Sequence, residues 1–312
     1  MPQMTLAPDQ SNKTRAIQAV ARAVELAEDG ESNIEVVAIS DLDLEGLKGT
    51  DLRPLLDRMI VAKHADLGLD ALLLAGVLDR LLPEVQAMVG FGDGEWRHKD
   101  VWKHTKQVVT QAVPRLNIRW AALFHDIGKV RTRSFGDNGE VHFFGHEVVG
   151  ARMFDKLEKR QRFFSSEETL RDSIRFLVLN HLRAGQYDSH WTDSAVRRFH
   201  KEIGENLDDL LCLSRADITT KRALKKKKGI AKINELGTRI KELAELDARV
   251  PPLPKGVGNE LMTHFKLPPS RLLGDIKRAL EAACEAGELK ANQESGYYVQ
   301  FVAEHPERFG LK

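Results

Sequence analysis

Apolar residues recur at helical spacing along most of the chain. In residues 14–28, Ile17, Val20 and Val24 stand among good helix formers, and Asp29-Gly30 follows as a stop signal. The same kind of pattern predicts helices over residues 51–62, 69–82, 100–113, 118–124, 146–162, 167–180, 194–204, 207–217, 230–248 and 269–287.

Two segments depart from this pattern. Residues 34–39 fit a strand, although six residues do not decide between a strand and a piece of helix. Residues 133–143 are predicted to form a β-hairpin, because Asp137-Asn138-Gly139 is typical of a tight turn between extended segments. The pattern therefore predicts an all-α helical bundle with one small β-hairpin and an additional helical C-terminal region.

Opposite charges balance over the whole chain. The 312 residues include 47 Lys and Arg against 46 Asp and Glu, so the formal net charge is +1. This balance, with 42% hydrophobic residues, excludes a globally basic nucleic-acid binder and an acidic disordered chain. Any surface for a polyanionic partner must therefore be local.

The run Lys221–Lys228 is one such local surface, since six of its eight residues are cationic. It is a candidate for RNA contact, and the alternative is a solvated helix face. Pro251-Pro252-Leu253-Pro254, further along the chain, is typical of a linker.

Cysteine content and hydropathy indicate a cytoplasmic protein. Only Cys212 and Cys284 are present, which excludes a disulfide scaffold and a Cys-rich zinc site. The longest apolar stretch, Ala71–Leu78, is too short to cross a bilayer, and residues 1–10 lack the features of a secretory signal. We therefore expect no membrane contact.

The surroundings of the dipeptide His125-Asp126 indicate a chemical role for it. It follows the apolar helical run Trp120–Phe124 and precedes a break at Gly128. Burying an ionisable pair beside such a run is costly unless something compensates, and a metal ion compensates well. The sequence therefore predicts a metal site at this turn.

Further candidate ligands lie beside other apolar helical runs, namely His104, His146, His181 and Asp217. Imidazole and carboxylate groups without a thiolate suit one or two divalent transition-metal ions, such as Mn, Fe, Co, Ni or Zn.

The order of these residues resembles that of the HD superfamily of metal-dependent phosphohydrolases. His104, His125-Asp126 and Asp217 match the order His, His-Asp, Asp, and Ile127-Gly128-Lys129 matches the continuation. His146 and His181 match the extended form of the family, which holds two metal ions. The resemblance implies an HD-domain helical bundle.

Three segments narrow the resemblance to the HD module of bacterial CCA-adding tRNA nucleotidyltransferases. They are residues 98–105, 119–129 and 141–147, and residues 272–280 resemble the C-terminal region of those enzymes. We accordingly divide the chain into an N-terminal helical segment (1–55), an HD phosphohydrolase domain (56–220) and a C-terminal helical region (221–312).

The resemblance does not extend to nucleotide addition. Those enzymes carry a nucleotidyltransferase head with paired carboxylates after a Gly-Ser turn. The segment before residue 56 is too short for that head, and no Gly-Ser element precedes Asp41 and Asp43. We therefore expect only the hydrolase part of the activity.

The resemblance implies roles for each candidate. His104, His125, Asp126 and Asp217 would hold the first metal, and a bridging Asp126 with His146 and His181 would hold the second. A metal-activated water would attack the phosphorus. Asp126 and Lys129 are the expected catalytic residues. The expected phosphate contacts are Lys129, Arg183, Arg197 and Arg198.

The expected substrate is a phosphoester of a nucleotide or RNA end. The resemblance indicates a 2′,3′-cyclic phosphodiesterase, a 2′-nucleotidase or phosphatase, or both. The alternative is an RNA-binding or nucleotide-sensing module with an HD-like fold and little turnover. Because histidines must be neutral to bind metal, we expect activity to fall below about pH 6.5.

Overall fold

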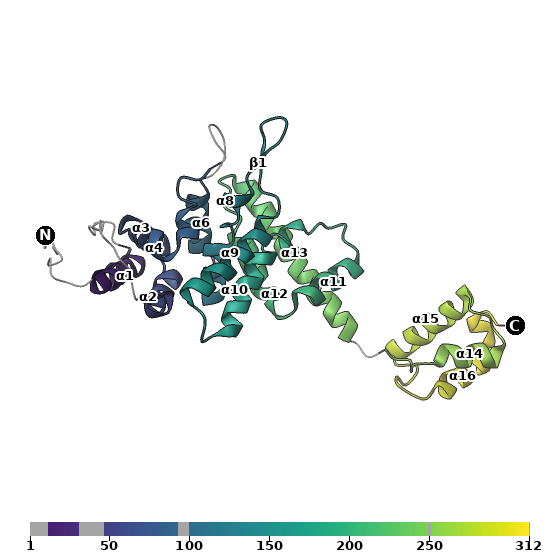
Figure 1. Ribbon diagram of the computed structural model, residues 1–312. Coiled ribbons are helices and arrows are strands. Elements are labelled where there is room, and N and C mark those ends of the chain that lie inside the picture. Colours follow the sequence, from purple (N-terminus) through teal and green to yellow (C-terminus); the bar gives the residue numbers. More distant parts are fainter. Residues whose placement is uncertain (1–11, 31–46, 93–99, 249–250, 312) are drawn as a thin grey trace. The chain divides into compact units, whose positions relative to one another are not determined.

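The computed structural model describes residues 12–30, 47–92, 100–248 and 251–311 (Figure 1). They are predominantly helical, and a two-stranded hairpin is the only sheet among them. The expectation of an all-α fold with one small hairpin is therefore confirmed. The predicted strand at 34–39 lies outside the described residues. The chain divides into two compact units, Met1–Ile240 and Lys241–Lys312.

Unit 1 contains a succession of mostly short helices. In chain order they are α1 (Asn12–Asp29), α2 (Gly49–Val61), α3 (Ala65–Leu74), α4 (Val77–Leu81), α5 (Pro83–Gln86), α6 (Val101–Gln111), α7 (Leu116–Phe124), α8 (Lys129–Thr132), α9 (His146–Gln161), α10 (Glu168–Asn180), η1 (Ala184–Gln186), α11 (Asp193–Ile203), η2 (Gly204–Asn206) and α12 (Leu207–Ala216). The last helix to begin in this unit is α13 (Ala223–Ala248).

Helix α7 lies at the centre of the core of unit 1. It is buried from Ile118 to Phe124, and it packs against α2, α6, α10 and α12. A helix that is buried on all sides requires such an envelope. The indole of Trp120 donates to Asp57 Oδ1 at 2.7 Å, and its ring stacks on Phe124 with a centroid separation of 5.6 Å. The His-Asp turn follows directly from this fixed helix.

The hairpin consists of β1 (Ser134–Phe135) and β2 (Val141–His142), paired antiparallel. Gly139 in the turn has φ 74°, a left-handed conformation that glycine adopts without strain. The predicted turn is therefore confirmed. Figure 1 shows the hairpin projecting from the helices of unit 1.

Unit 2 contains α14 (Val257–Phe265), α15 (Arg271–Glu285), α16 (Ser295–Glu304) and η3 (Pro306–Phe309). Leu261, Leu280 and Tyr298 are fully buried in its own apolar core. The Tyr298 hydroxyl lies within hydrogen-bond distance of two backbone carbonyls, at 3.0 Å from Pro252 O and 2.8 Å from Lys290 O. The predicted helix at 269–287 is thus found as α15.

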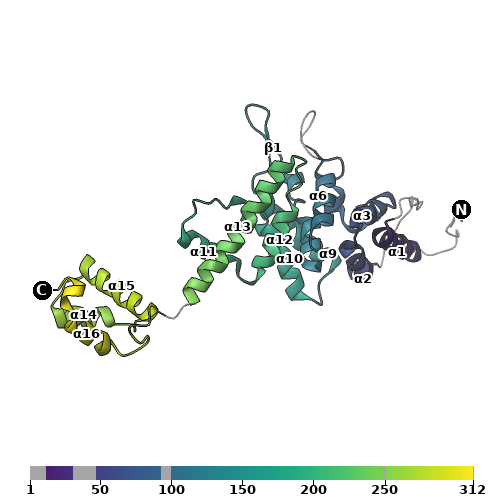
Figure 2. The ribbon, with the colours of Figure 1, turned by 180° about the vertical axis from the view of Figure 1, so that it is seen from behind.

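Two predicted helices differ from the structure by more than two residues at an end. The helix predicted over 69–82 begins at Ala65 and is interrupted at Gly76, which has φ 78°. Helix α13 begins at Ala223 rather than near residue 230 (Figure 2). Its lysines are good helix formers, so Lys225–Lys228 occupy its first turns.

No helix within the described ranges has the length and apolar character needed to span a membrane. Cys212 and Cys284 are both free thiols.

Candidate metal centre

Six side chains predicted to bind metal converge in unit 1, although they come from five helices or helix ends. They are His104 of α6, His125 at the C-cap of α7, Asp126 in the following turn, His146 at the start of α9, His181 at the C-cap of α10 and Asp217 at the C-cap of α12. His125, Asp126 and His181 have side chains only 1% exposed.

One side of the cluster is formed by His104, His125, Asp126 and Asp217. Asp126 Oδ2 lies 3.4 Å from His104 Nε2 and 3.2 Å from His125 Nε2. Asp217 Oδ1 lies 3.0 Å from His104 Nε2 and 3.6 Å from His125 Nε2. Two carboxylates and two imidazole nitrogens therefore face one another.

The other side is formed by Asp126, His146 and His181. Asp126 Oδ1 lies 3.4 Å from His146 Nε2 and 3.9 Å from His181 Nε2. The two oxygens of Asp126 thus face different pairs of histidines. This arrangement is what a carboxylate shared between two ions requires.

Hydrogen bonds from the far side of each ring fix three of the histidines. The Nδ1–H groups of His125, His146 and His181 donate to the carbonyls three residues earlier, at 2.8, 2.7 and 2.7 Å. Two of these carbonyls lie in the last turns of α7 and α10, where helical acceptors lack a helical partner. The bonds leave each Nε2 as the nitrogen with the free lone pair when the ring is neutral.

The spacing of the ring nitrogens provides a test of fit for a metal. His146 Nε2 lies 3.2 Å from His181 Nε2, and His104 Nε2 lies 3.3 Å from His125 Nε2. Lone pairs facing at this distance repel unless a proton or a cation lies between them. Two groups have the compactness of a metal site, His104 with His125 and Asp126, and Asp126 with His146 and His181. The donor set therefore fits divalent transition-metal ions.

Charges within the cluster shift its protonation. Burial lowers the pKa of the His125 imidazole, but Asp126 and Asp217 outweigh burial and raise that pKa to about 10. Burial raises the pKa of the Asp126 carboxyl, yet the charge and hydrogen bond of His125 hold it well below its usual range. Burial and the charge of His125 lower the pKa of His181 to about 4. At neutral pH the protein's own groups thus retain a proton on His125 and leave His181 neutral.

Lys129 lies at the edge of the cluster. Its Nζ is 2.6 Å from Asp126 Oδ2 and 5.6 Å from the centroid of the Phe143 ring. The ammonium therefore supplies positive charge directly beside the shared carboxylate.

The three arginines predicted to contact phosphate occupy other surroundings. Arg183 pairs with Glu202 and lies over the Phe199 ring, 5.6 Å from its centroid. Arg197 is partly buried on α11, and Arg198 is exposed on the same helix. Their contact with substrate phosphate stays a prediction.

Sequence reasoning missed the groups that orient the rings. Thr219 Oγ1 lies 2.9 Å from His104 Nδ1 and plays the part that backbone carbonyls play for the other three histidines. Its position two residues after Asp217 could have suggested this role. The carbonyls of Ala122, Phe143 and Val178 could not be identified from the sequence, because every residue has a backbone carbonyl.

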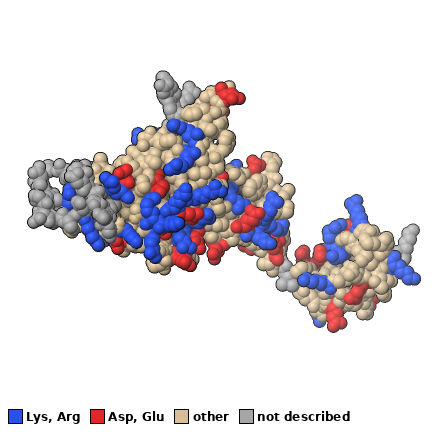
Figure 3. Space-filling view, viewed as in Figure 1, with Lys and Arg blue, Asp and Glu red and all other residues tan. Residues whose placement is uncertain are grey.

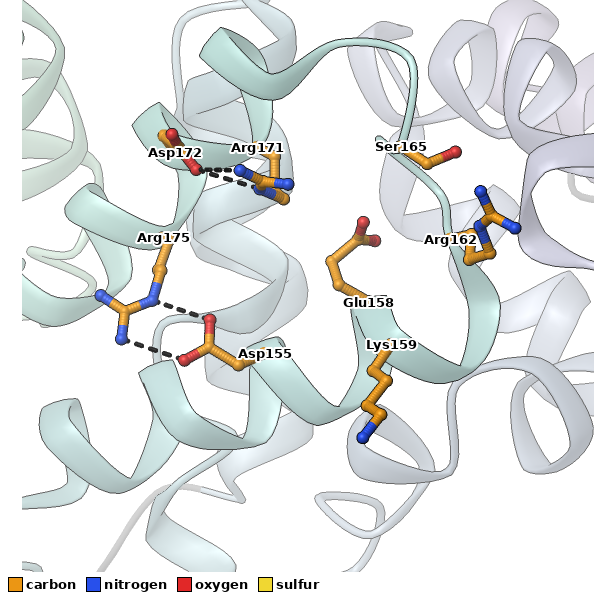
Figure 4. Close-up of a pocket in the computed structure, with 8 residues that line it drawn as sticks. All are labelled: Asp155, Glu158, Lys159, Arg162, Ser165, Arg171, Asp172 and Arg175. Carbon is orange, nitrogen blue, oxygen red and sulfur yellow. Dashed lines mark hydrogen bonds and ion pairs between the residues drawn. The ribbon is translucent and has the colours of Figure 1, made fainter.

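A cavity of about 500 Å³ lies elsewhere in unit 1, between the end of α9 and the start of α10 (Figure 4). Figure 4 shows Arg171 paired with Asp172 and Arg175 paired with Asp155. Figure 3 shows cationic and anionic side chains interleaved over the face of unit 1 that it presents. The cavity shares no lining residue with the His/Asp cluster and is a separate, polar hollow.

Residues 101–221 match the HD domain family. All six clustered side chains lie within this segment, so the expectation of an HD domain is confirmed. HD domains form a superfamily of metal-dependent hydrolases, and this segment is a member of it.

Two bacterial proteins match most of the chain. The A-adding tRNA nucleotidyltransferase of Deinococcus radiodurans is 31% identical over 261 residues, which cover 81% of this chain and 58% of that protein. The CC-adding tRNA nucleotidyltransferase of Thermus thermophilus is 28% identical over 252 residues, which cover 79% and 55%. The chain is therefore homologous to tRNA nucleotidyltransferases, as the resemblance predicted, and spans somewhat more than half of their length.

Proposed function

We propose that this protein is a metal-dependent phosphohydrolase whose active site is the His/Asp cluster of unit 1. The observation that supports this most is the pair of compact ligand groups that share Asp126, within a segment matching the HD family. We assign the hydrolase domain to residues 56–220, the N-terminal helical segment to 1–55 and the C-terminal helical region to 221–312.

Each residue of the cluster has a definite part in the proposed site. His104, His125, Asp126 and Asp217 would hold one ion, and Asp126, His146 and His181 would hold the other. Bound divalent ions supply Lewis acidity toward phosphoryl oxygens and lower the pKa of water. Backbone carbonyls accept the Nδ1–H of three rings, so Nε2 is the nitrogen that would face an ion, and Lys129 places a cation where negative charge grows on the phosphoryl group.

The proposed substrate is the phosphoester of a nucleotide or RNA end. Water would open the ring of a 2′,3′-cyclic phosphodiester to give a monoester, release inorganic phosphate from a 2′-phosphomonoester, or do both. The names of the two relatives, both tRNA nucleotidyltransferases, support an RNA end over other phosphoesters.

A hydrolysis panel tests this proposal. Purified protein is supplied with Mn²⁺, Ni²⁺ or Co²⁺ and given nucleoside 2′-, 3′- and 2′,3′-cyclic phosphates, and phosphate release or ring opening is followed. We expect turnover that Asp126→Asn reduces by at least about a hundredfold, because both ligand groups lose the shared carboxylate.

The matched control is Asp188→Asn, which alters an exposed His-Asp pair formed with His190 outside the cluster. It should leave turnover unchanged. Absence of hydrolysis with all three metals, or equal loss in both variants, would contradict the proposed function.

RNA contact through Lys221–Lys228 is a second proposal, with its own observation. Arg222, Lys225, Lys227 and Lys228 are exposed at and before the start of α13. RNA binding through these cations should weaken steeply as the salt concentration rises. The alternative function is an RNA-binding module with little turnover. If it is correct, His125→Ala should keep its RNA affinity and the hydrolysis panel should show no turnover. Lack of RNA binding at low salt excludes that alternative.

A further inference from the structure

The segment that leads from the hairpin into α9 presents an exposed aromatic surface. The Phe144 side chain is 77% exposed, the second most exposed large hydrophobic residue among the described ones after Leu224. Its ring lies nearly parallel to the His142 ring, with an interplanar angle of 16° and centroids 4.9 Å apart. One flat face of the Phe144 ring therefore lies against the His142 ring, and much of the rest of the phenyl group is open to solvent.

The pair belongs to the segment that leads into His146 of the candidate metal centre. The carbonyl of Phe143, between the two stacked residues, accepts the Nδ1–H of His146 at 2.7 Å. The Phe143 ring contacts Phe91 at a centroid distance of 6.3 Å and lies below Lys129 Nζ. The backbone that carries Phe144 is therefore held by the same contacts that orient a proposed ligand.

Chain geometry limits how far Phe144 can lie from the cluster. Two trans peptide links separate it from His146, so their Cα atoms are at most about 7.6 Å apart. A nucleotide whose phosphate lies at the cluster would place its base within reach of a surface at this separation. A phosphoester without a base would leave the surface unused.

We propose that Phe144, supported by His142, is a nucleobase-binding subsite of the His/Asp centre. The flat ring would stack on a base of any identity, since every base has a π face. The inference rests on the proposed function for the location of the phosphate, and it adds the side chain that would bind the base of the nucleotide or unpaired RNA end.

The kinetic test compares a cyclic phosphate that carries a base and a ribose with one that has neither. The native protein, Phe144→Ala and Phe144→Tyr are each assayed with adenosine 2′,3′-cyclic phosphate and with glycerol 1,2-cyclic phosphate. We expect Phe144→Ala to raise KM for the adenosine substrate by about tenfold and to leave the glycerol substrate unaffected, because only stacking is lost. Phe144→Tyr, which keeps the flat face, should retain the native KM.

A second measurement does not depend on turnover. In Phe144→Trp, adenosine 2′-monophosphate should quench the fluorescence of the new indole, and glycerol 2-phosphate should not. Leu74→Ala, which removes a 60% exposed side chain from α3, is the control for loss of exposed apolar surface. It should change neither measurement.

Outcomes separate this inference from the proposed function. Hydrolysis of both substrates with equal KM changes in Phe144→Ala, or no quenching by the adenosine ligand, would overturn the subsite while leaving the hydrolase in place. Quenching without any hydrolysis would support the subsite and contradict the hydrolase.

Discussion

Gly128 lies against the first turn of α9 so closely that a Cβ atom placed on it would be 2.1 Å from the carbonyl oxygen of His146. Its own backbone is ordinary, with φ −67°, so glycine is required here by contact and not by conformation. The turn that carries Asp126 and the helix that carries His146 meet at this point. The two ligands are thereby held in register.

Gly128→Ala should separate these two elements. A Cβ this close to backbone atoms forces α9 to move, and such overpacking costs roughly 1–3 kcal/mol. We expect a folded protein with a lower melting temperature and metal affinity reduced by at least about tenfold. Circular dichroism and chelator competition measure the two effects.

Gly150→Ala is the matched control, because a Cβ on Gly150 of α9 would meet its nearest atom at an ordinary 3.5 Å. It should leave metal affinity at the native value. Native metal affinity in Gly128→Ala would show that the position of α9 does not depend on this contact.

The sharing of Asp126 predicts a pattern of metal stoichiometry. His146→Ala removes a member of one ligand group only, so elemental analysis should find one ion fewer than in the native protein. Asp126→Asn weakens both groups and should reduce occupancy of both. An identical loss in the two variants would contradict the shared role of Asp126.

The ligands could be predicted from the sequence because their types and surroundings are local properties. His125-Asp126 follows an apolar helix and His181 ends another, and such helices bury the residues at their C-terminal ends. The convergence of six residues from distant segments depends on packing around α7, which the pattern alone does not specify. The close approach of Gly128 to α9 and the exposure of Phe144 are likewise tertiary features.

The run Lys221–Lys228 shows a different limit of prediction from the sequence. Its charge is evident from the sequence, but its secondary structure is not, because the predicted helix begins after the last lysine of the run. In the structure, Lys226 Nζ donates to Gln111 Oε1 at 2.6 Å, and Gln111 Nε2 donates to Ala216 O at 2.8 Å. These tertiary contacts link the first turn of α13 to α6 and α12 and favour a helix that starts earlier.

Thr219→Val tests the importance of ring orientation at His104. The substitution keeps the branched shape but removes the hydroxyl 2.9 Å from His104 Nδ1. Loss of a partner that orients a ligating histidine typically reduces metal affinity by about 10–100-fold. We expect this loss in a chelator-competition assay, without a matching loss of helical structure.

Thr110→Val is the control, since the Thr110 hydroxyl donates within α6 to the carbonyl of Lys106 and touches no proposed ligand. Its metal affinity should equal that of the native protein. If both variants retained native affinity, His104 would be oriented by packing alone.

The protonation of His125 predicts how metal binding depends on pH. Its pKa in the folded protein is raised from the ordinary 6.5 to about 10, so its proton stabilises the metal-free fold fully below pH 6.5 and progressively less up to about pH 10. A metal ion must displace this proton, because only the neutral ring binds metal. The raised pKa of His125 extends the competition between proton and metal above pH 6.5, beyond the range that the ordinary histidine pKa predicts.

We expect the apparent affinity for the first ion to rise by about one log unit per pH unit from pH 6.5 to 9. His181, with its pKa lowered to about 4, is already neutral and contributes no proton in this range. Calorimetry at pH 7.5 in buffers of different ionisation enthalpy should detect about one proton released per first ion. Constant affinity above pH 7, with no proton released, would mean that His125 is neutral before the metal binds and that Asp126 and Asp217 do not hold its proton.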